Sequence, residues 1–185
     1  MPARSTTLFD DARAGKRDAL AELWRTHHAP LLRYLRARRV TAPEDVASQV
    51  WVDVAGSIER FDGGADDFRR WLFTIGHRRS VDEIRRSVRR SGVAIRAADH
   101  AAGADVEHDR DASLDRAIAM VATLPDNLAE AVMLRVVNDL PIADVAAVMG
   151  VSEGNVRVLV HRGLARLRRK LVVTDEPHVA IKRVS

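Results

Sequence analysis

The chain has 185 residues, 46% of them hydrophobic, and a formal net charge of +4. This length is enough for one or two small domains with hydrophobic cores. No apolar run approaches the ~20 residues that a membrane-spanning helix needs, and no signal-peptide core is present, so we expect no membrane insertion. The absence of cysteine excludes disulfides and thiolate metal sites, and it agrees with a reducing cytoplasmic location.

Charge divides the chain into three blocks. Residues 1–90 hold 18 Lys and Arg against 13 Asp and Glu, residues 91–115 hold 2 against 6, and residues 116–185 hold 10 against 7. Two basic blocks flank an acidic middle. This pattern predicts two modules that face nucleic acid, joined by a linker that does not contact it. We place this flexible linker at residues 91–112, where no apolar stripe is sustained.

The first module, residues 8–90, is predicted to be helical. Its first apolar stripe is interrupted or kinked at Pro30. A second helix begins at a capping box of Thr41 and Glu44, with Pro43 in its first turn, and ends before a loop at residues 62–66. The stripe of the first helix consists of Leu20, Leu23, Trp24, His27, Leu31 and Leu35, and that of the second consists of Val46, Val50, Val54 and Ile58.

A third helix is predicted from residue 67 to about residue 90, with one apolar and one basic side. Asp82 and Glu83 offset only part of the basic charge. The basic face is either simply solvated or in contact with a phosphate backbone, and the lack of regular acid–base spacing favours the phosphate. The apolar side consists of Phe68, Trp71, Leu72, Ile75, Ile84 and Val88, and the basic side consists of Arg78, Arg79, Arg85, Arg86, Arg89 and Arg90.

The second module, residues 113–171, begins with two predicted helices that meet at Pro125-Asp126, and a tail without strong pattern follows at residues 172–185. Because no segment of the chain alternates as a strand, we predict an all-α fold: two small helical domains joined by a flexible linker. The first stripe of the second module consists of Leu114, Ala117, Ile118, Val121 and Leu124, and the next consists of Leu128, Val132 and Val136.

Residues 138–170 have the pattern of a helix-turn-helix. A short apolar-faced helix ends at Gly150, the residue expected where a helix finishes in the left-handed conformation. Ser152 then caps a longer helix, because its side-chain oxygen can accept a free first-turn N–H group. The buried stripe of the longer helix consists of Val156, Val160, Leu164, Leu167 and Leu171.

The free face of the longer helix has the composition of a DNA reader, since the first turns of such a helix enter a major groove. Arg157 and Arg162 suit guanine edges, and Asn155 suits adenine. The alternative is an ordinary helical hairpin with a solvated basic face. The free face consists of Glu153, Asn155, Arg157, Val158, His161 and Arg162, and the residues suited to phosphates are Arg166, Arg168, Arg169 and Lys170.

The sequence lacks the signatures of enzymes, metal sites and cofactor sites. Its seven histidines form no HExxH motif, and no GxGxxG, GxSxG or phosphate-binding glycine loop is present. Asp62, Asp66 and Asp67 cluster, but the later positions of a calcium loop are missing. We therefore expect no catalytic activity, no cofactor and no metal.

Three segments, taken in order, resemble the extracytoplasmic-function sigma factors of bacterial RNA polymerase. Residues 43–61 (PEDVASQVWVDVAGSIERF) are similar to the region 2 helix that docks on the polymerase clamp. Residues 68–86 (FRRWLFTIGHRRSVDEIRR) are similar to the promoter-melting and minus-10 segment. Residues 124–168 are similar to the region 4 pattern that reads the minus-35 element. The resemblance covers roughly residues 8–90 and 113–171.

The resemblance implies a role for each face. The clamp of the beta-prime subunit would bind the residues Glu44, Asp45, Ser48 and Gln49. A flipped minus-10 base and its flanking DNA would bind the residues Asp62, Gly63, Gly64, Ala65, Asp66, Arg78, Arg79, Arg85 and Arg86. The minus-35 element would bind the residues Asn155, Arg157, Val158, His161 and Arg162, with Val158 suited to a thymine methyl group.

The chain is thus predicted to bind core RNA polymerase, through the beta-prime clamp and the beta subunit, and to direct it to promoter DNA. The resemblance also implies an anti-sigma factor as a partner. Two alternatives are a stand-alone helix-turn-helix regulator, which needs only residues 113–171, and a sigma-like decoy for an anti-sigma factor. The clamp-like helix argues against the first, and the lack of room for a phosphoacceptor domain argues against the second.

Overall fold

The computed structural model of the protein describes residues 3–91 and 109–174. These two ranges contain helices and no strand, which confirms the prediction of an all-α fold. Most of the predicted linker, and the tail beyond residue 174, lie outside the described residues. No helix of the described ranges is long and apolar enough to cross a membrane.

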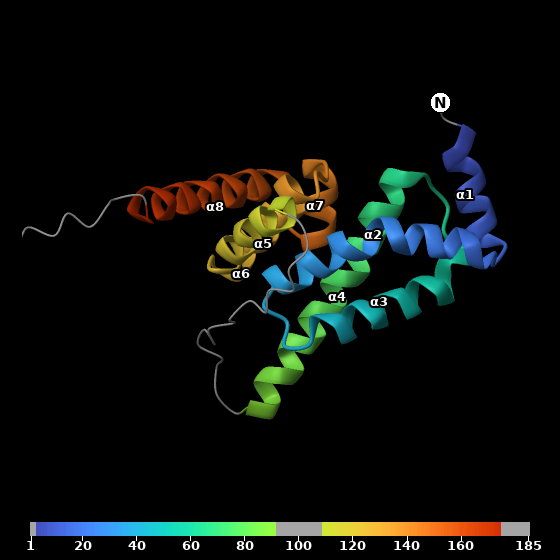
Figure 1. Cartoon of the computed structure of the whole chain (residues 1–185), viewed down its shortest axis with the longest axis horizontal. Coiled ribbons are helices and arrows are strands. Elements are labelled where there is room, and N and C mark those ends of the chain that lie inside the picture. Colours follow the sequence, from blue (N-terminus) through green and yellow to red (C-terminus); the bar gives the residue numbers. More distant parts are fainter. Residues whose placement is uncertain (1–2, 92–108, 175–185) are drawn as a thin grey trace, which may run out of the picture.

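The first bundle consists of α1 (Ala3–Arg13), α2 (Arg17–Ala37), α3 (Pro43–Ser57), the short 3-10 turn η1 (Ile58–Arg60) and α4 (Ala65–Ser91) (Figure 1). Helices α2, α3 and α4 pack against one another, and α1 lies against α2 and η1. Their stripes meet in a core that includes Leu31, Tyr34, Val50 and Leu72, all fully buried. This core fixes the directions in which the polar sides of α3 and α4 face solvent.

The second bundle consists of α5 (Asp109–Ala122), α6 (Asp126–Val132), the π-helical turn η2 (Met133–Val137), α7 (Ile142–Met149) and α8 (Glu153–Thr174). Helix α8 packs on α6 and α7. Val156, Leu159, Val145 and Leu134 are buried in this small core. The predicted break at Pro125-Asp126 is confirmed, because α5 ends just before it and α6 begins at Asp126.

The structure contradicts an interruption at Pro30 and a cap at Thr41, while a kink at Pro30 stays a prediction. Pro30 does not interrupt the first long helix, since it lies inside α2, which continues to Ala37 and is anchored on both sides of the proline by buried residues such as Leu23 and Leu31. Thr41 does not cap α3, because the preceding residue of that helix is Ala42 and no side chain caps it. The Thr41 hydroxyl instead lies 3.4 Å from that of Ser87 on α4.

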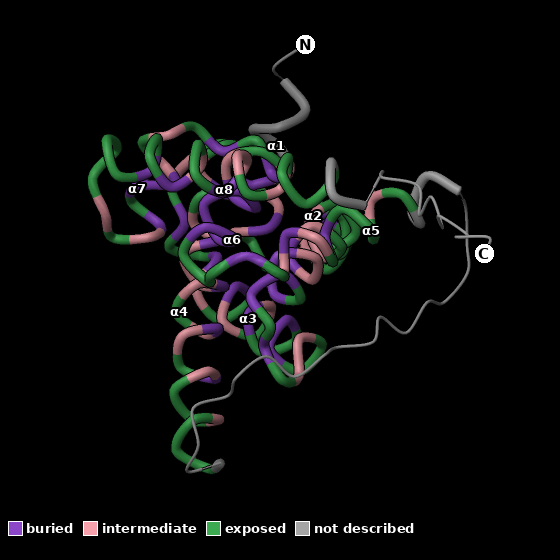
Figure 2. Tube along the Cα trace, turned by 90° about the vertical axis from the view of Figure 1, so that its left-hand side faces the viewer, coloured by how far each residue is buried: buried purple, intermediate pink, exposed green. Residues whose placement is uncertain are grey.

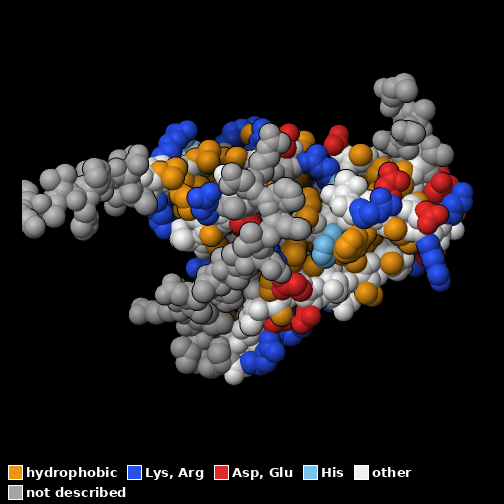
Figure 3. Space-filling view, viewed as in Figure 1, with side chains coloured by type: hydrophobic (Ala, Val, Ile, Leu, Met, Phe, Trp, Pro, Cys, Tyr) orange, Lys and Arg blue, Asp and Glu red, His pale blue; other side chains and the backbone are white. Residues whose placement is uncertain are grey.

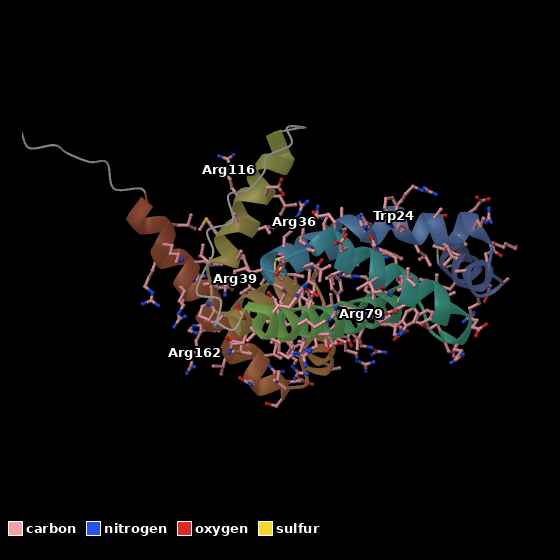
Figure 4. All side chains as sticks on the ribbon, turned by 90° about the horizontal axis from the view of Figure 1, so that it is seen from below. Trp24, Arg36, Arg39, Arg79, Arg116 and Arg162 are labelled. Carbon is pink, nitrogen blue, oxygen red and sulfur yellow. The ribbon has the colours of Figure 1, made fainter. Side chains whose placement is uncertain are left out.

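Four large apolar residues of the predicted stripes are exposed. Trp24 and Val136 follow closely on buried residues, Leu23 and Leu134, so they lie at the edge of their stripes. Val88 and Leu171 lie in the last turns of α4 and α8. Trp24 stacks on His28 instead, with ring centroids 4.5 Å apart, and projects from α2 on the side away from α4 (Figure 4). The exposed fractions are 45% for Trp24, 42% for Val88, 49% for Val136 and 54% for Leu171.

The two bundles pack directly against each other (Figures 1 and 2). Helix α2 contacts α5, α6 and η2, and α4 contacts α7. The last turns of α4 extend beyond this contact and are exposed (Figure 2). The sequence predicts two modules but gives no indication of this packing.

Candidate nucleic-acid interface

The turn between α7 and α8 has the geometry that the sequence predicts. Gly150 adopts a left-handed conformation with φ 66° and ψ 35°, which a residue with a Cβ rarely adopts. The next N–H group, that of Val151, donates to the carbonyl of Ala146 at 3.1 Å and closes the helix end. The Ser152 hydroxyl accepts a hydrogen bond from the Asn155 N–H at 3.2 Å, so the predicted cap of α8 is confirmed.

The face of α8 that is turned away from the core holds all five residues predicted to read DNA. Val156 and Leu159 are buried, and the side chains between them point to solvent. Arg162 projects outward from α8 (Figure 4), and Lys and Arg side chains gather along this helix in Figure 3. The exposed residues are Asn155, Arg157, Val158, His161 and Arg162.

Helix α8 approaches α6 unusually closely at Gly163. A Cβ built on this glycine would lie 2.6 Å from Cγ2 of Val132 and 3.4 Å from the carbonyl oxygen of Leu128. Only glycine therefore allows the two helices to lie at this distance. The apolar spacing of α8 does not reveal this close contact with α6.

The loop that precedes α4 borders an open cavity of about 350 Å³. Asp67 holds the loop in shape, because one carboxylate oxygen accepts the Gly64 N–H at 3.1 Å and the other accepts Arg70 at 3.0 Å. Trp71 stacks on Phe61 at 5.2 Å and forms an aromatic wall. The cavity is lined by Ser57, Arg60, Phe61, Asp62, Asp67, Arg70, Trp71 and Thr74.

The predicted minus-10 residues divide into two groups around this cavity. Asp62 lines it, and Gly63 and Gly64 form the loop beside it. Ala65 and Asp66, which the sequence places in the loop, are the first two residues of α4. The four predicted arginines, Arg78, Arg79, Arg85 and Arg86, lie further along α4 and do not line the cavity. The loop and the arginines are therefore two adjacent surfaces, one hollow and one basic.

The arginines of α4 differ in what they contact. Arg78 and Arg85 are exposed. Arg79 forms a two-pronged ion pair with Asp53 of α3, with both N–O distances 2.6 Å, and these hydrogen bonds lower the pKa of the Asp53 carboxyl. Arg86 pairs with Glu83 at 3.2 Å. In this structure Arg79 joins α3 to α4, a role that sequence spacing does not distinguish from a free basic face.

The outer side of α3 presents the predicted polymerase-binding residues. Glu44, Asp45, Ser48 and Gln49 are all exposed. Glu44 pairs with Arg36 at 3.0 Å, and this hydrogen bond lowers the pKa of its carboxyl.

Sequence reasoning missed Val52, which lies one turn after Ser48 on this face of α3 and is 63% exposed. The signal that could have found it is its position between Val50 and Val54, two residues of the buried stripe on the other side of the helix. An apolar group in the middle of a polar face suits a protein partner better than solvent.

The described residues contain no group of three or more His, Asp or Glu side chains that could hold a metal ion. The carboxylates of the loop and of the first turn of α4 pair with arginines: Asp67 with Arg70, Asp66 with Arg69 and Asp62 with Arg13. The chemistry that these exposed faces offer is recognition by charge, hydrogen bonding and stacking.

Two family models match this chain in the order of its bundles. Residues 23–90 match Sigma-70 region 2, and residues 114–167 match Sigma-70 region 4. The first match contains α3, the loop and most of α4, and the second contains the turn and the exposed face of α8.

Several curated proteins that are similar to this chain are sigma factors, and the match covers most of the length of the two described next. The ECF RNA polymerase sigma factor SigD of Mycobacterium tuberculosis is 29% identical over 183 residues, which span 94% of this chain and 86% of that protein. The ECF RNA polymerase sigma factor ShbA of Streptomyces griseus is 30% identical over 180 residues, which span 87% of this chain and 92% of that protein.

Two solved structures share the fold. CnrH, in complex with the cytosolic domain of CnrY, has a TM-score of 0.63 and 22% identity, covering 92% of this chain and 97% of that one. The sigma factor RpoE of Bartonella quintana, in complex with the anti-sigma factor NepR, has a TM-score of 0.66 and 21% identity, covering 84% and 98%.

Proposed function

The chain belongs to the ECF RNA polymerase sigma factors, and we propose that it uses three separate exposed faces to direct core polymerase to promoters. As a sigma factor it directs transcription initiation, while the polymerase forms the phosphodiester bonds. A protein that assembles with core polymerase works in the bacterial cytoplasm.

We assign the minus-35 element to the face of α8 that begins at Asn155. Arg157 and Arg162 can each pair with the two acceptors of a guanine edge, and Asn155 can pair with adenine. Val158, which is 45% exposed, offers a thymine methyl group an apolar contact. The capped start of α8 adds unpaired N–H groups and a positive helix end, which favour a DNA phosphate.

We assign the minus-10 element to the cavity beside the loop that precedes α4 and the first turn of that helix. A flipped base needs a hollow with a flat aromatic wall and polar groups for its edge, because extrusion costs a few kcal/mol that stacking and hydrogen bonds must offset. Trp71 supplies a wall and Thr74, Asp62 and Arg70 supply polar groups. The exposed Arg78 and Arg85 are placed to contact the phosphates that lead to that base.

We assign the polymerase clamp to the outer face of α3. Asp45 and Glu44 give that face its negative charge, which suits the basic helices of a beta-prime clamp, and Val52 adds an apolar contact at its centre. Region 4 would meet the beta subunit. An anti-sigma factor is a further proposed partner, supported by the complex of the related fold with NepR.

The observation that carries this proposal is that three faces with the required chemistry are exposed on separate elements of two matched regions. Footprinting of promoter DNA tests it. Core polymerase with this chain should protect the minus-35 element and make minus-10 thymines reactive to permanganate, while the chain or the core alone should do neither. Tight, core-independent binding to a palindrome would instead favour the stand-alone regulator.

A further inference from the structure

The cavity assigned to the minus-10 element, the minus-10 cavity, holds two hydroxyl groups whose protons are already donated. Ser57, the last residue of α3, donates to the backbone carbonyl of Asp53, and Thr74 of α4 donates to that of Arg70 at 2.8 Å. Both side chains line the cavity and are half-buried. Because a hydroxyl has one proton and two lone pairs, each can only accept a hydrogen bond from a molecule in the cavity.

The carboxylate of Asp62 is a third acceptor at this cavity. Its side chain lines the cavity and is fully exposed. Its partner Arg13 is 3.9 Å away, which is longer than a hydrogen bond. An ionised carboxylate carries no proton, so it also can only accept.

The side-chain donors that line the cavity are turned toward carboxylates of the protein. Arg70 donates to Asp67 at 3.0 Å and to Asp144 at 3.3 Å, and Arg60 pairs with Glu59 at 3.5 Å. The indole N–H of the aromatic wall lies in the plane of its ring, so a base stacked on the ring face does not reach it. The polar groups that face a stacked base are therefore mainly oxygen acceptors.

Oxygen acceptors favour a base that brings N–H donors. Cytosine, adenine and guanine each carry an exocyclic amino group, whereas thymine has a carbonyl oxygen on either side of its single ring N–H. Placing these oxygens against the hydroxyl and carboxylate oxygens of the cavity would leave acceptors facing acceptors. A site that is built to accept a hydrogen bond rejects an analogue that lacks the donor.

We propose that the minus-10 cavity selects a flipped base with an exocyclic amino group and rejects thymine, and that Thr74 and Asp62 determine this specificity. The inference rests on the proposed function of the cavity as the site of a flipped base. Thr74 follows Trp71 by three residues, so the two side chains are neighbours on one face of α4 and the hydroxyl borders the aromatic wall. Asp62 comes from the loop that precedes α4.

Exchange of the amino group on single bases tests this specificity. The probe is a promoter whose minus-10 element is held open by a mismatched template strand, so that base pairing does not contribute to binding. In its non-template strand each cytosine is replaced in turn by uracil, and each adenine or guanine by hypoxanthine, which lacks the amino group. We expect the holoenzyme to bind at least about tenfold more weakly when one particular position is exchanged, and thymine at that position should weaken binding as much.

Two variants connect that position to the cavity. Thr74→Val removes the hydroxyl and keeps the shape, and Asp62→Asn adds an amide N–H that can donate to a carbonyl oxygen. Each should lower the affinity ratio of the amino base to its exchanged form by at least about threefold. The matched controls should leave the ratio unchanged: Thr26→Val, whose hydroxyl donates to the Glu22 carbonyl on α2, and Asp66→Asn, which is exposed and does not line the cavity.

An abasic nucleotide at each position separates the possible outcomes. If one abasic site weakens binding but the amino exchange there does not, or if thymine is preferred there, the inference is overturned and a captured base stands. The same holds if both cavity variants keep the wild-type ratio, which misfolding cannot alter because inactive protein lowers both affinities alike. If no abasic site weakens binding, the cavity captures no base, and its proposed function is overturned as well.

Discussion

Arg157 is held by Glu153 on the surface of α8, with an N–O distance of 2.9 Å, before any DNA is bound. The pair is exposed on both sides, so releasing the guanidinium to a base costs little. The same pair keeps Arg157 on the outward face from which a guanine edge is reached.

The prediction for Arg157→Ala is therefore a loss of discrimination at one minus-35 base, by about 1–3 kcal/mol. Competition binding of the holoenzyme to promoters that differ at single base pairs measures it. Arg166→Ala is the control, since a phosphate contact weakens all sequences alike. An equal loss on every sequence for Arg157→Ala would make it a phosphate contact too.

His27 makes folding stability depend on pH. Burial, and then the nearby charge of Arg69, lower its pKa from 6.5 to about 4, and its ring packs on Phe68 at 5.2 Å. Between these two values the unfolded chain binds more protons than the folded one, so stability rises with pH. The contribution of His27 is complete above pH 6.5 and is lost as pH falls toward 4.

Denaturant unfolding should show this dependence as a slope of at most about 1.4 kcal/mol per pH unit. His27→Gln should flatten it. His28→Gln is the matched control, because His28 is more exposed and its pKa is lowered by burial alone, so its removal should change the slope less. Equal slopes in wild type and His27→Gln would show that His27 titrates normally. The lowered pKa of Glu130 changes folding stability in a separate pH range, below 4.5, where stability is lost as pH falls.

At the scale of elements, the approach of α8 to α6 depends on the missing side chain at Gly163. Gly163→Ala places a methyl group against Val132, and such overpacking costs typically 1–3 kcal/mol, reduced by the higher helix propensity of alanine. Gly154→Ala adds the same methyl group to α8 at an ordinary contact distance, 4.0 Å from the Ser152 hydroxyl oxygen, and should be neutral or stabilising by up to about 1 kcal/mol.

Calorimetric melting of the two glycine variants measures the difference. Gly163→Ala should melt below wild type, and Gly154→Ala should melt at or above it. If both melt alike, α8 can move away from α6 without cost, and the role given to Gly163 would be disproved.

The elements that could be predicted are those in which local signals agree. Apolar spacing, Gly150 and Ser152 together locate α7, the turn and the start of α8 within the sequence. The predicted cap at Thr41 is wrong because α3 begins at Pro43, directly after Ala42, and no side chain caps it. The prediction for Trp24 is wrong because periodicity alone does not show where the buried stripe of α2 has its edge.

At the scale of the whole molecule, the packing of the two bundles could not be predicted. Glu130 lies in an apolar stretch with no neighbouring base, and its partners Tyr34, Arg38 and His77 are 53 to 96 residues away in the sequence. Arg79 is a similar case, because its partner Asp53 lies on another helix. Ion pairs between residues far apart in the sequence leave no local pattern, whereas core stripes and helix caps do.

Charge reversal at Asp45 tests the polymerase face. Asp45→Lys should weaken binding to core polymerase by roughly tenfold or more, because it places a cation against a basic clamp. Glu22→Lys, an exposed substitution on α2, is the control, and DNA binding by region 4 should be intact in both. Unchanged core affinity for Asp45→Lys would remove α3 from the polymerase interface.

This chain gives core RNA polymerase its promoter specificity, and run-off transcription with purified core polymerase is the measurement that checks this. We expect a transcript of defined length that requires both the chain and its promoter and that falls with Asp45→Lys. If wild type gives no promoter-dependent transcript at saturating core polymerase, the chain does not supply promoter specificity.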